Sequence, residues 1–502
     1  MAKLKITLIV VLILSLSSKG LGFFRDILIT NYVGFNEKTD AIFVAISICT
    51  LLFSIFNTTI RTTFAPMFSA NFLQDPITVI REYKEIRRFL ILVMFVTSLL
   101  VFFFPGIFIK IITPGLSGET LTYALIFLKY LSFIIFLYGV FFISTGFLQS
   151  MNIFQTVEYG NLFNNMVIVT FIFLFYKHMG INSVIFGLLF GAFIQALYGQ
   201  LRLHKRIKRY KVKNEKNLFN YHKIKQFIKN SQYILFGSMV SQLTVLSDKF
   251  VASFLNQGSI TALHYSNVLK NLPLNIIVLV VTNILFTNLS IYYVKNKEKF
   301  NFFITEQIKY LLFLISPIFI MMFVYSEEIV RLLYFRGAFT ERGVEMTSQA
   351  LMAYSAGLFF IVIKEVLTKV CYAAKNTKLP LLVSILSLII NLVFNFILSY
   401  YFYHIGIAIA TTISVIINCF VLLYYLNKFN VIENVKLILV ITFKYSLMLL
   451  ITLVSIYSLK NTILINFSDR LNLLFGLGMI FIIYISFHKK LGIDLKLLRV
   501  KR

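Results

Sequence analysis

The sequence predicts an all-α membrane protein that crosses the bilayer about 14 times. Of its 502 residues, 59% are hydrophobic, the mean hydropathy is +0.84, and long apolar runs recur from end to end. A soluble chain of this size needs far more polar surface to cover its core, whereas about 20 apolar residues in a helix cross the roughly 30 Å of hydrocarbon in a bilayer. The runs are expected to be helical, because lipid offers the backbone no hydrogen-bond partners. The expected spans begin near residues 6, 41, 88, 121, 158, 180, 223, 261, 306, 344, 379, 404, 434 and 468.

The distribution of charge predicts how the chain is oriented. It carries 48 Lys and Arg against 20 Asp and Glu, a net charge of +28. Most of the basic residues lie between the spans, above all in residues 1–5, 204–229 and 491–502. Loops rich in Lys and Arg stay on the cytoplasmic side, where they meet anionic lipid. We therefore expect both termini and the central linker in the cytoplasm, with membrane lipids rather than nucleic acid as the partners of this charge.

The basic linker divides the chain into two similar halves. An offset of 226 residues superposes Asn165 on Asn391 and Gly180 on Gly406. We expect two six-helix lobes in a parallel pseudo-repeat plus two C-terminal helices, an arrangement typical of transporters. The expected parts are an N-terminal lobe 1–204, a linker 205–222, a C-terminal lobe 223–430, two added spans in 431–490 and a cytoplasmic tail 491–502.

Several charged side chains fall inside the expected spans, where a charge is costly unless it faces protein or a water-filled cavity. They are Lys19, Arg25, Asp26, Arg61, Asp248, Lys249, Lys270, Lys364, Glu365 and Lys369. Their basic surplus suits an anionic substrate such as a pyrophosphate. The alternative is structural: local ion pairs that hold spans together, or side chains such as Lys270 that reach the membrane surface. The sequence contains no GxxxxGK[ST] motif and no metal-ligand spacing, so we expect a transporter and not an enzyme.

Ordered motifs resemble one family of transporters, the MurJ/MviN lipid II flippases of the multidrug/oligosaccharidyl-lipid/polysaccharide exporter superfamily. Residues 18–46 read SKGLGFFRDILITNYVGFNEKTDAIFVAI, close to the family's S-[RK]-x-L-G-x-x-R-D and T-D-A-F-x-V-A. The segments TPGL (113–116), NLP (271–273), IVRLLYFRGAFT (329–340), ALMAYSAGL (350–358) and YAAKNTKLP (372–380) follow in order. The resemblance implies two six-helix lobes with two added helices, a bacterial plasma membrane location, and a role in peptidoglycan and cell wall biogenesis and cell shape.

The resemblance also implies a substrate cavity. The family's charged positions in its first span fall on Lys19, Arg25 and Asp26, and the acid of T-D-A falls on Asp40. Two further cavity candidates, Arg61 and Lys270, come from the charges of spans two and eight. The family's arginine pair in span two is absent here, and Val268 stands at the position of its span-eight arginine.

A sodium site described in the family maps onto four oxygen-bearing side chains, Asp248, Asn391, Asn395 and Thr411. Oxygen ligands suit a hard cation, and Asn395 replaces an acid of the family pattern. The alternative is interhelical hydrogen bonding by these side chains. No cofactor is expected to be required beyond Na⁺ as a coupling ion.

The function implied is translocation of undecaprenyl-pyrophosphate-linked lipid II from the inner to the outer leaflet by alternating access, with cell-wall synthesis proteins as further partners. The lost arginines keep a second reading open, a flippase for another polyprenyl-linked glycan such as an O-antigen, capsule or teichoic-type precursor. A cation-coupled drug exporter is a third, which the basic surplus disfavours. A membrane-embedded glycosyltransferase would need a large extracytoplasmic loop, which the sequence lacks.

Overall fold

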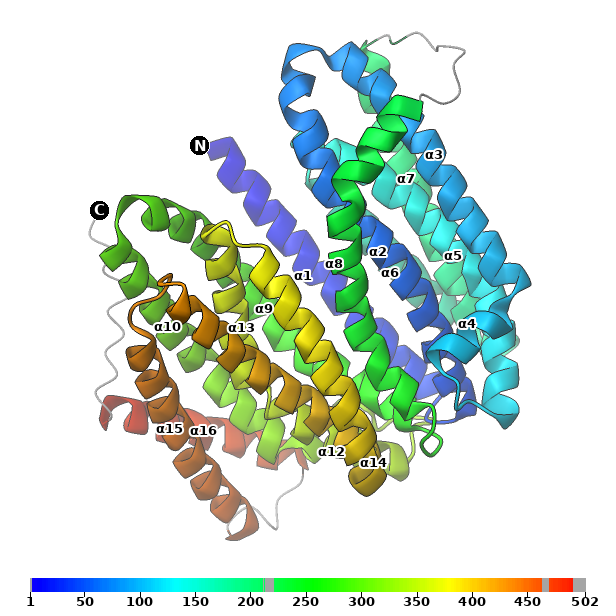
Figure 1. The fold of residues 1–502 in the computed structure, drawn as a ribbon. Helices are drawn as coiled ribbons and strands as arrows, with labels where there is room; N and C mark the ends of the chain where they lie inside the picture. The colour runs from blue at the N-terminus through cyan, green and yellow to red at the C-terminus, as the bar shows by residue number, and fades with distance from the viewer. Residues whose placement is uncertain (1, 211, 213–220, 463–468, 491–502) are drawn as a thin grey trace. The chain divides into compact units, whose positions relative to one another are not determined.

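The described part of the chain folds entirely into helices and short connections. The structure is a computed structural model that describes residues 2–210, 212, 221–462 and 469–490. Residues 211 and 213–220 of the expected linker 205–222 and the expected tail 491–502 therefore lie outside the described residues. The helices, shown in Figure 1, are α1 (Ala2–Tyr32), α2 (Glu37–Gln74), α3 (Pro76–Phe103), α4 (Pro105–Ile112), α5 (Gly118–Ser150), α6 (Gln155–Met179), α7 (Asn182–Ile207), the short η1 (Lys208–Tyr210), α8 (Tyr221–Ala252), α9 (Ser259–Lys295), α10 (Lys297–Val324), α11 (Ser326–Tyr334), α12 (Glu341–Ser355), α13 (Leu358–Ala373), α14 (Lys378–Lys428), α15 (Val435–Thr462) and α16 (Asp469–Lys490).

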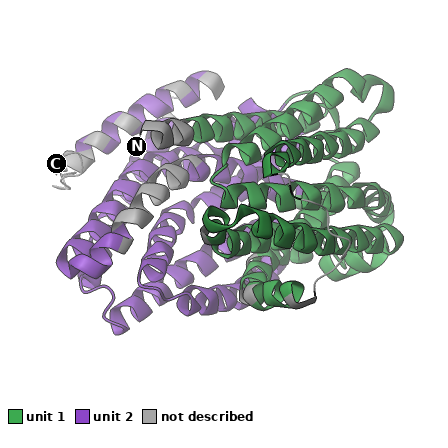
Figure 2. Ribbon diagram, turned by 90° about the horizontal axis from the view of Figure 1, so that it is seen from above, with its two compact units in different colours: residues 1–260, 336–339 green, residues 261–335, 340–502 purple. Residues whose placement is uncertain are grey.

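These helices form two compact units, coloured separately in Figure 2. Unit 1 comprises Met1–Ile260 and Arg336–Phe339, and unit 2 comprises Thr261–Phe335 and Thr340–Arg502. Within unit 1, α5 packs against α2, α3 and α7, and α8 packs against α2 and α3. Within unit 2, α10 contacts α12, α13, α15 and α16. The helix α8, which lies in the expected C-terminal lobe, thus belongs to unit 1, and the expected lobe boundaries stay a prediction.

The fold class predicted from the sequence is confirmed. Among the described residues, nine helices are long and apolar enough to span a membrane, and α12 with α13 forms a tenth candidate bent by 46°. Each of the expected spans falls on a described helix, with α14 carrying two of them. The largest shift is in α3, expected from residue 88 and found to begin at Pro76, because its first turns are polar and basic rather than apolar.

Two helical reversals have the same unusual backbone conformation. Gly180 lies between α6 and α7 with φ 55° and ψ −136°, and Tyr403 interrupts the 51-residue α14 with φ 51° and ψ −131°. A positive φ breaks a right-handed helix and is uncommon for residues other than glycine. Just beyond Tyr403, a Cβ on Gly406 would lie 2.2 Å from the carbonyl oxygen of Leu398, so the return of the chain requires glycine. Both hairpins thus turn at a residue with positive φ, although the second turn lies three residues before Gly406, the position that the repeat aligns with Gly180.

Polar side chains cap the first turns of α2 and α3. The Asn36 side chain accepts hydrogen bonds from the backbone N–H groups of Lys38 and Thr39 at the start of α2. Asp75 caps α3 in the same way, and Pro76 takes the first helical position. Such caps satisfy donors that the first helical turn leaves unpaired. Asn36 and Asp75 thus fix where α2 and α3 begin.

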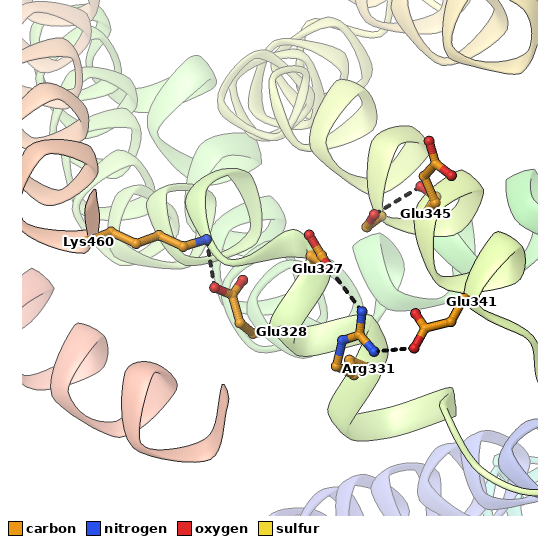
Figure 3. A network of polar contacts seen from close by, with 7 residues as sticks. Glu327, Glu328, Arg331, Glu341, Glu345 and Lys460 are labelled. Atoms are coloured by element: carbon orange, nitrogen blue, oxygen red, sulfur yellow. Dashed lines mark hydrogen bonds and ion pairs between the residues drawn. The ribbon is translucent and has the colours of Figure 1, made fainter. Parts of the chain in front are cut away.

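Charged side chains tie the C-terminal helices to the rest of unit 2 (Figure 3). The Lys460 ammonium near the end of α15 lies 2.6 Å from a carboxylate oxygen of Glu328 in α11 and donates a 2.9 Å hydrogen bond to the carbonyl of Val324. It also lies over the Tyr325 ring, 5.1 Å from its centroid. The Glu328 side chain is only 8% exposed. Beside it, the more exposed Arg331 bridges Glu327 and Glu341 at 3.1 and 2.8 Å.

We predict that Lys460→Met lowers the free energy of unfolding of the detergent-purified protein by about 1–3 kcal/mol, because it leaves the Glu328 carboxylate buried beside apolar groups. The loss should fall below that of a fully buried pair, since solvent reaches the lysine. Chemical or thermal unfolding measures the change. The control Glu327→Gln removes an exposed partner and should shift stability by no more than about 0.5 kcal/mol. Equal effects of the two substitutions would contradict the anchoring role of Lys460.

Candidate functional site

The helices α1 and α6 pack side by side and run in the same direction. Their hydrogen bonds fix the position of the α1 residues predicted to line the site. The Asn165 side-chain amide donates to the Ser18 carbonyl at 3.0 Å and to the Ser18 hydroxyl at 3.2 Å. Further along, the Tyr176 hydroxyl donates to the Tyr32 carbonyl at 2.7 Å, and the two tyrosine rings stack. Polar pairs of this kind join helices within lipid, because no water is present there to compete for the hydrogen bonds. They hold the stretch of α1 that carries Lys19, Arg25 and Asp26.

Arg25 and Asp26 form an ion pair inside α1. The Arg25 Nε and Nη2 atoms donate to one carboxylate oxygen of Asp26 at 3.0 and 2.8 Å. The Asp26 side chain is 4% exposed and that of Arg25 is 27% exposed. Consecutive residues point about 100° apart on a helix, so the long arginine side chain folds back to reach its neighbour. The carboxylate is therefore buried behind a guanidinium that solvent still reaches.

A carboxylate of α6 lies among the basic residues of α1 and α2. Glu158 attracts both Lys19 and Arg61 electrostatically. Arg61 Nε also donates a 3.0 Å hydrogen bond to the Gln149 side-chain oxygen at the end of α5. Lys19, Arg61 and Glu158 thus form one charge cluster that draws on three helices of unit 1. Sequence reasoning missed Glu158, because an acid in the first turn of a helix is ordinarily explained by the helix dipole.

Asp40 lies at a junction between α2 and the segment after α8. Its Oδ2 atom accepts a 2.7 Å hydrogen bond from the backbone N–H of Gly258, and the residue is 3% exposed. Gly258 has φ +92°, and a Cβ there would lie 2.3 Å from the Phe35 ring. Nearby, the Lys249 ammonium donates to the Phe43 carbonyl and the Ser47 hydroxyl of α2. Asp40 therefore has a packing role in unit 1, and its predicted part in substrate binding stays a prediction.

Lys270 is buried within unit 2. It is 7% exposed, and its ammonium lies 4.3 Å from the centroid of the Tyr354 ring. A cation over an aromatic face is stabilised by the ring quadrupole. The lysine is therefore packed within unit 2 against an aromatic ring, and its part in substrate binding stays a prediction.

Three of the four predicted sodium ligands lie together in unit 2. Asn391 and Asn395 are fully buried. The Asn395 amide donates to the Asn391 side-chain oxygen at 3.2 Å, and the Asn391 amide donates to the Thr411 hydroxyl at 3.3 Å across the α14 reversal. Their oxygens are of the type that a hard cation accepts. Asp248 belongs to unit 1. The described residues contain no group of three or more His, Cys, Asp and Glu side chains placed to hold a metal ion.

Many apolar spanning helices, charge clusters within them and the paired helical reversals define a multi-pass membrane transporter. The family model described as lipid II flippase MurJ matches residues 29–483. The chain therefore belongs to the MurJ family, as the motifs of its sequence predicted, and it is a transporter of the flippase class and not an enzyme.

Individual relatives agree with this assignment. The chain is 31% identical over 438 residues to the probable lipid II flippase MurJ of Buchnera aphidicola subsp. Schizaphis graminum, covering 86% of this chain and 84% of that protein. It is 27% identical over 421 residues to the lipid II flippase MurJ of Thermosipho africanus, covering 84% and 85%.

Solved structures show the same fold. One described as lipid II flippase MurJ in an inward closed conformation matches with a TM-score of 0.83 and 26% identity, over 97% of this chain and 99% of that one. An inward-facing multidrug transporter of the MATE family shares the fold alone, with a TM-score of 0.68 at 12% identity over 84% and 95% of the two chains.

We predict that Asp40→Ala lowers the free energy of unfolding by about 1–3 kcal/mol, because the buried N–H of Gly258 loses its acceptor. Asp40→Asn should retain most of the stability, since an amide oxygen can accept the same bond. The control Glu37→Ala removes another acid from the same helical turn and so corrects for the helix dipole. Unfolding of the purified variants measures all three. If Asp40→Ala and Glu37→Ala are equally stable, the contact to Gly258 contributes nothing.

Proposed function

We propose that this protein moves lipid II, the undecaprenyl-pyrophosphate-linked precursor of peptidoglycan, from the inner to the outer leaflet of the bacterial plasma membrane. Membership of the MurJ family supports this substrate. The observation that carries the proposal is a set of basic side chains, Lys19 and Arg25 on α1 and Arg61 on α2, none of which is buried. The α1 helix has 31 residues, and α2 is long and apolar enough to span a membrane. Charges at such positions are expensive and mark a substrate pathway.

In the proposed mechanism the pyrophosphate headgroup enters among these side chains while the polyprenyl tail stays in lipid. Arg25 presents a planar fork of donors to phosphate oxygens, and Asp26 orients that fork from behind. Glu158 partly neutralises Lys19 and Arg61 before the headgroup arrives, so the anionic substrate competes with an internal carboxylate. A competing acid keeps the headgroup from binding too tightly to be released when the two halves alternate.

The orientation of the chain is part of the proposal. The basic ends of α3, α7 and α9 (Lys84, Arg87, Lys205, Arg206 and Lys295) would face the cytoplasm together with both termini. The substrate would then enter from the side on which its precursors are made, and cell-wall synthesis proteins on the far side would use the product.

A second candidate is a flippase for another polyprenyl-linked glycan. Val268 occupies the position at which the family pattern has a span-eight arginine. The nearby Lys270 interacts with the Tyr354 ring, and a lysine offers phosphate a point charge instead of a fork. A changed set of cations suits a changed headgroup, such as a teichoic-type or capsule precursor. A drug exporter remains the weaker reading, because basic residues repel cationic drugs.

Loss of Arg25 should abolish transport. We predict that Arg25→Ala fails to restore growth of a strain depleted of its own lipid II flippase, that Arg25→Lys restores a small fraction, and that Asp26→Asn is less harmful than Arg25→Ala. The reason is that only arginine supplies the bidentate contact. Membrane levels of each variant must match wild type, because breaking a buried pair also costs stability.

Normal growth with Arg25→Ala at wild-type levels would overturn the phosphate role of Arg25. Failure of the wild type itself to support growth, combined with transport of another polyprenyl-linked glycan in vesicles, would favour the second candidate.

We further propose that Na⁺ is the coupling ion, held by Asp248, Asn391, Asn395 and Thr411. The hydrogen-bonded chain from Asn395 to Thr411 supports a polar centre in unit 2. Na⁺ would draw these oxygens around itself in place of their mutual hydrogen bonds. With Asn395 in place of an acid, the site has one negative charge fewer and should be weak.

We predict that NaCl raises the melting temperature of the purified protein relative to KCl at equal ionic strength, and that Asp248→Asn abolishes this difference. Asn395→Asp adds a carboxylate and should enlarge it, because affinity for a hard cation rises with ligand charge. A wild type whose melting temperature is the same in both salts would leave only hydrogen bonding between the helices.

A further inference from the structure

A basic pocket lies where α3 begins and α7 ends, within unit 1. It has a volume of about 580 Å³, and its lining includes Lys84, Arg87, Gln200, Leu201, His204 and Lys208. The described residues that line it include three basic side chains, Lys84, Arg87 and Lys208, and one histidine, but neither Asp nor Glu. Lys84 also lies within electrostatic range of Arg87 and Arg88. Like charges held this close repel one another, and a bound anion relieves that repulsion.

Hydrogen bonds join two side chains of the pocket lining, Arg87 and Gln200, to each other and to α5. The Arg87 Nη2 atom of α3 donates a 2.6 Å hydrogen bond to the Gln200 side-chain oxygen of α7. The Gln200 amide in turn donates to the Ser144 hydroxyl at 2.6 Å and to the Val140 carbonyl of α5 at 3.2 Å. Because the hydrogen bonds fix Arg87, the pocket is preorganised, unlike a set of independent surface lysines.

An exposed apolar strip on α7 leads to the pocket. Phe190, Phe193, Leu197 and Leu201 are all exposed and are spaced three and four residues apart, so they share one face of the helix. Continued by three and seven residues, that face reaches His204 and Lys208. Apolar side chains exposed along a membrane span contact acyl chains, and the basic residues lie where the span ends and headgroups begin.

The geometry points to an anionic phospholipid as the ligand of this site. We propose that the phosphate of one phospholipid, such as phosphatidylglycerol, binds among Lys84, Arg87 and Lys208 while an acyl chain lies along the strip from Phe190 to Leu201. A soluble phosphate would use the cations alone, but the strip favours a lipid. The ligand differs from the transported substrate, and the inference does not depend on the proposed function.

The positive-inside pattern by itself also places basic residues at the ends of spans, so the experiment must separate a pocket from diffuse charge. The test variant is Lys84→Gln/Lys208→Gln, which spares Arg87 and its hydrogen bonds. The matched control is Lys205→Gln/Arg209→Gln, which removes two charges from the same end of unit 1. These two residues line a separate pocket on the other side of α7.

Native mass spectrometry of the detergent-solubilised protein, titrated with phosphatidylglycerol or phosphatidylcholine, provides the measurement. The wild type should retain one phosphatidylglycerol at concentrations at which phosphatidylcholine is lost. The test variant should bind it about 10- to 30-fold more weakly, from two charges near the membrane surface, and the control should bind within about threefold of wild type. Lys84→Arg/Lys208→Arg should retain binding.

Three outcomes would overturn the proposal. Equal losses in the test and control variants would show diffuse attraction and no pocket. Equal retention of the two lipids would show an apolar site without phosphate recognition. Displacement of the bound lipid by inorganic phosphate at the same concentration would make the site one for a soluble anion. Matching melting temperatures of the variants exclude misfolding as the cause, and none of these readouts requires that the protein transport anything.

Discussion

The inability of lipid to form hydrogen bonds is the constraint on which this structure depends. It makes each span a helix, and it makes any polar side chain within a span find a partner in the protein. The Asn165–Ser18 contact joins α6 to α1 in this way, and the Gln200–Ser144 contact joins α7 to α5. In water these amides would gain little by pairing. In the membrane they align the helices along their axes and so determine which residues of neighbouring helices lie next to each other.

The same constraint explains how the surplus of basic residues is managed. Carboxylates lie beside the cations: the buried Asp26 pairs with Arg25, and the half-buried Glu158 attracts Lys19 and Arg61. Lys270 instead uses an aromatic face. Each arrangement lowers the free-energy cost of placing a cation inside a spanning helix, and the cation can still attract an anion. On the proposed function the site needs both properties, since it must be stable when empty and must release the pyrophosphate-linked lipid that it binds.

Two kinds of feature shape the hairpins and the C-terminal pair. Positive φ angles at Gly180 and Tyr403 each reverse the chain within a few residues. The reversal at Tyr403 brings Asn391 beside Thr411. The Glu328–Lys460 pair then fastens α15 to α11 (Figure 3), so the two added helices contribute to the packing of unit 2. Local backbone geometry therefore positions the polar centre of α14, and the Glu328–Lys460 pair adds a polar anchor to the packing of α15 against α10 and α16.

The amino-acid sequence by itself determined the fold class, the family and the approximate position of each span. These properties depend on hydrophobicity summed over about 20 residues and on ordered motifs, and such averages survive errors at single positions. The charges within the first span singled out Arg25 with Asp26, and the family resemblance singled out Asp248, Asn391, Asn395 and Thr411. Three of these four lie close together because they face each other across one hairpin. The role of Glu158, the contact of Asp40 with Gly258 and the burial of Lys270 against Tyr354 were decided only by the tertiary structure. Each of these pairs residues that lie far apart in the sequence, so the register of one helix on another sets the contact, and no local pattern encodes that register.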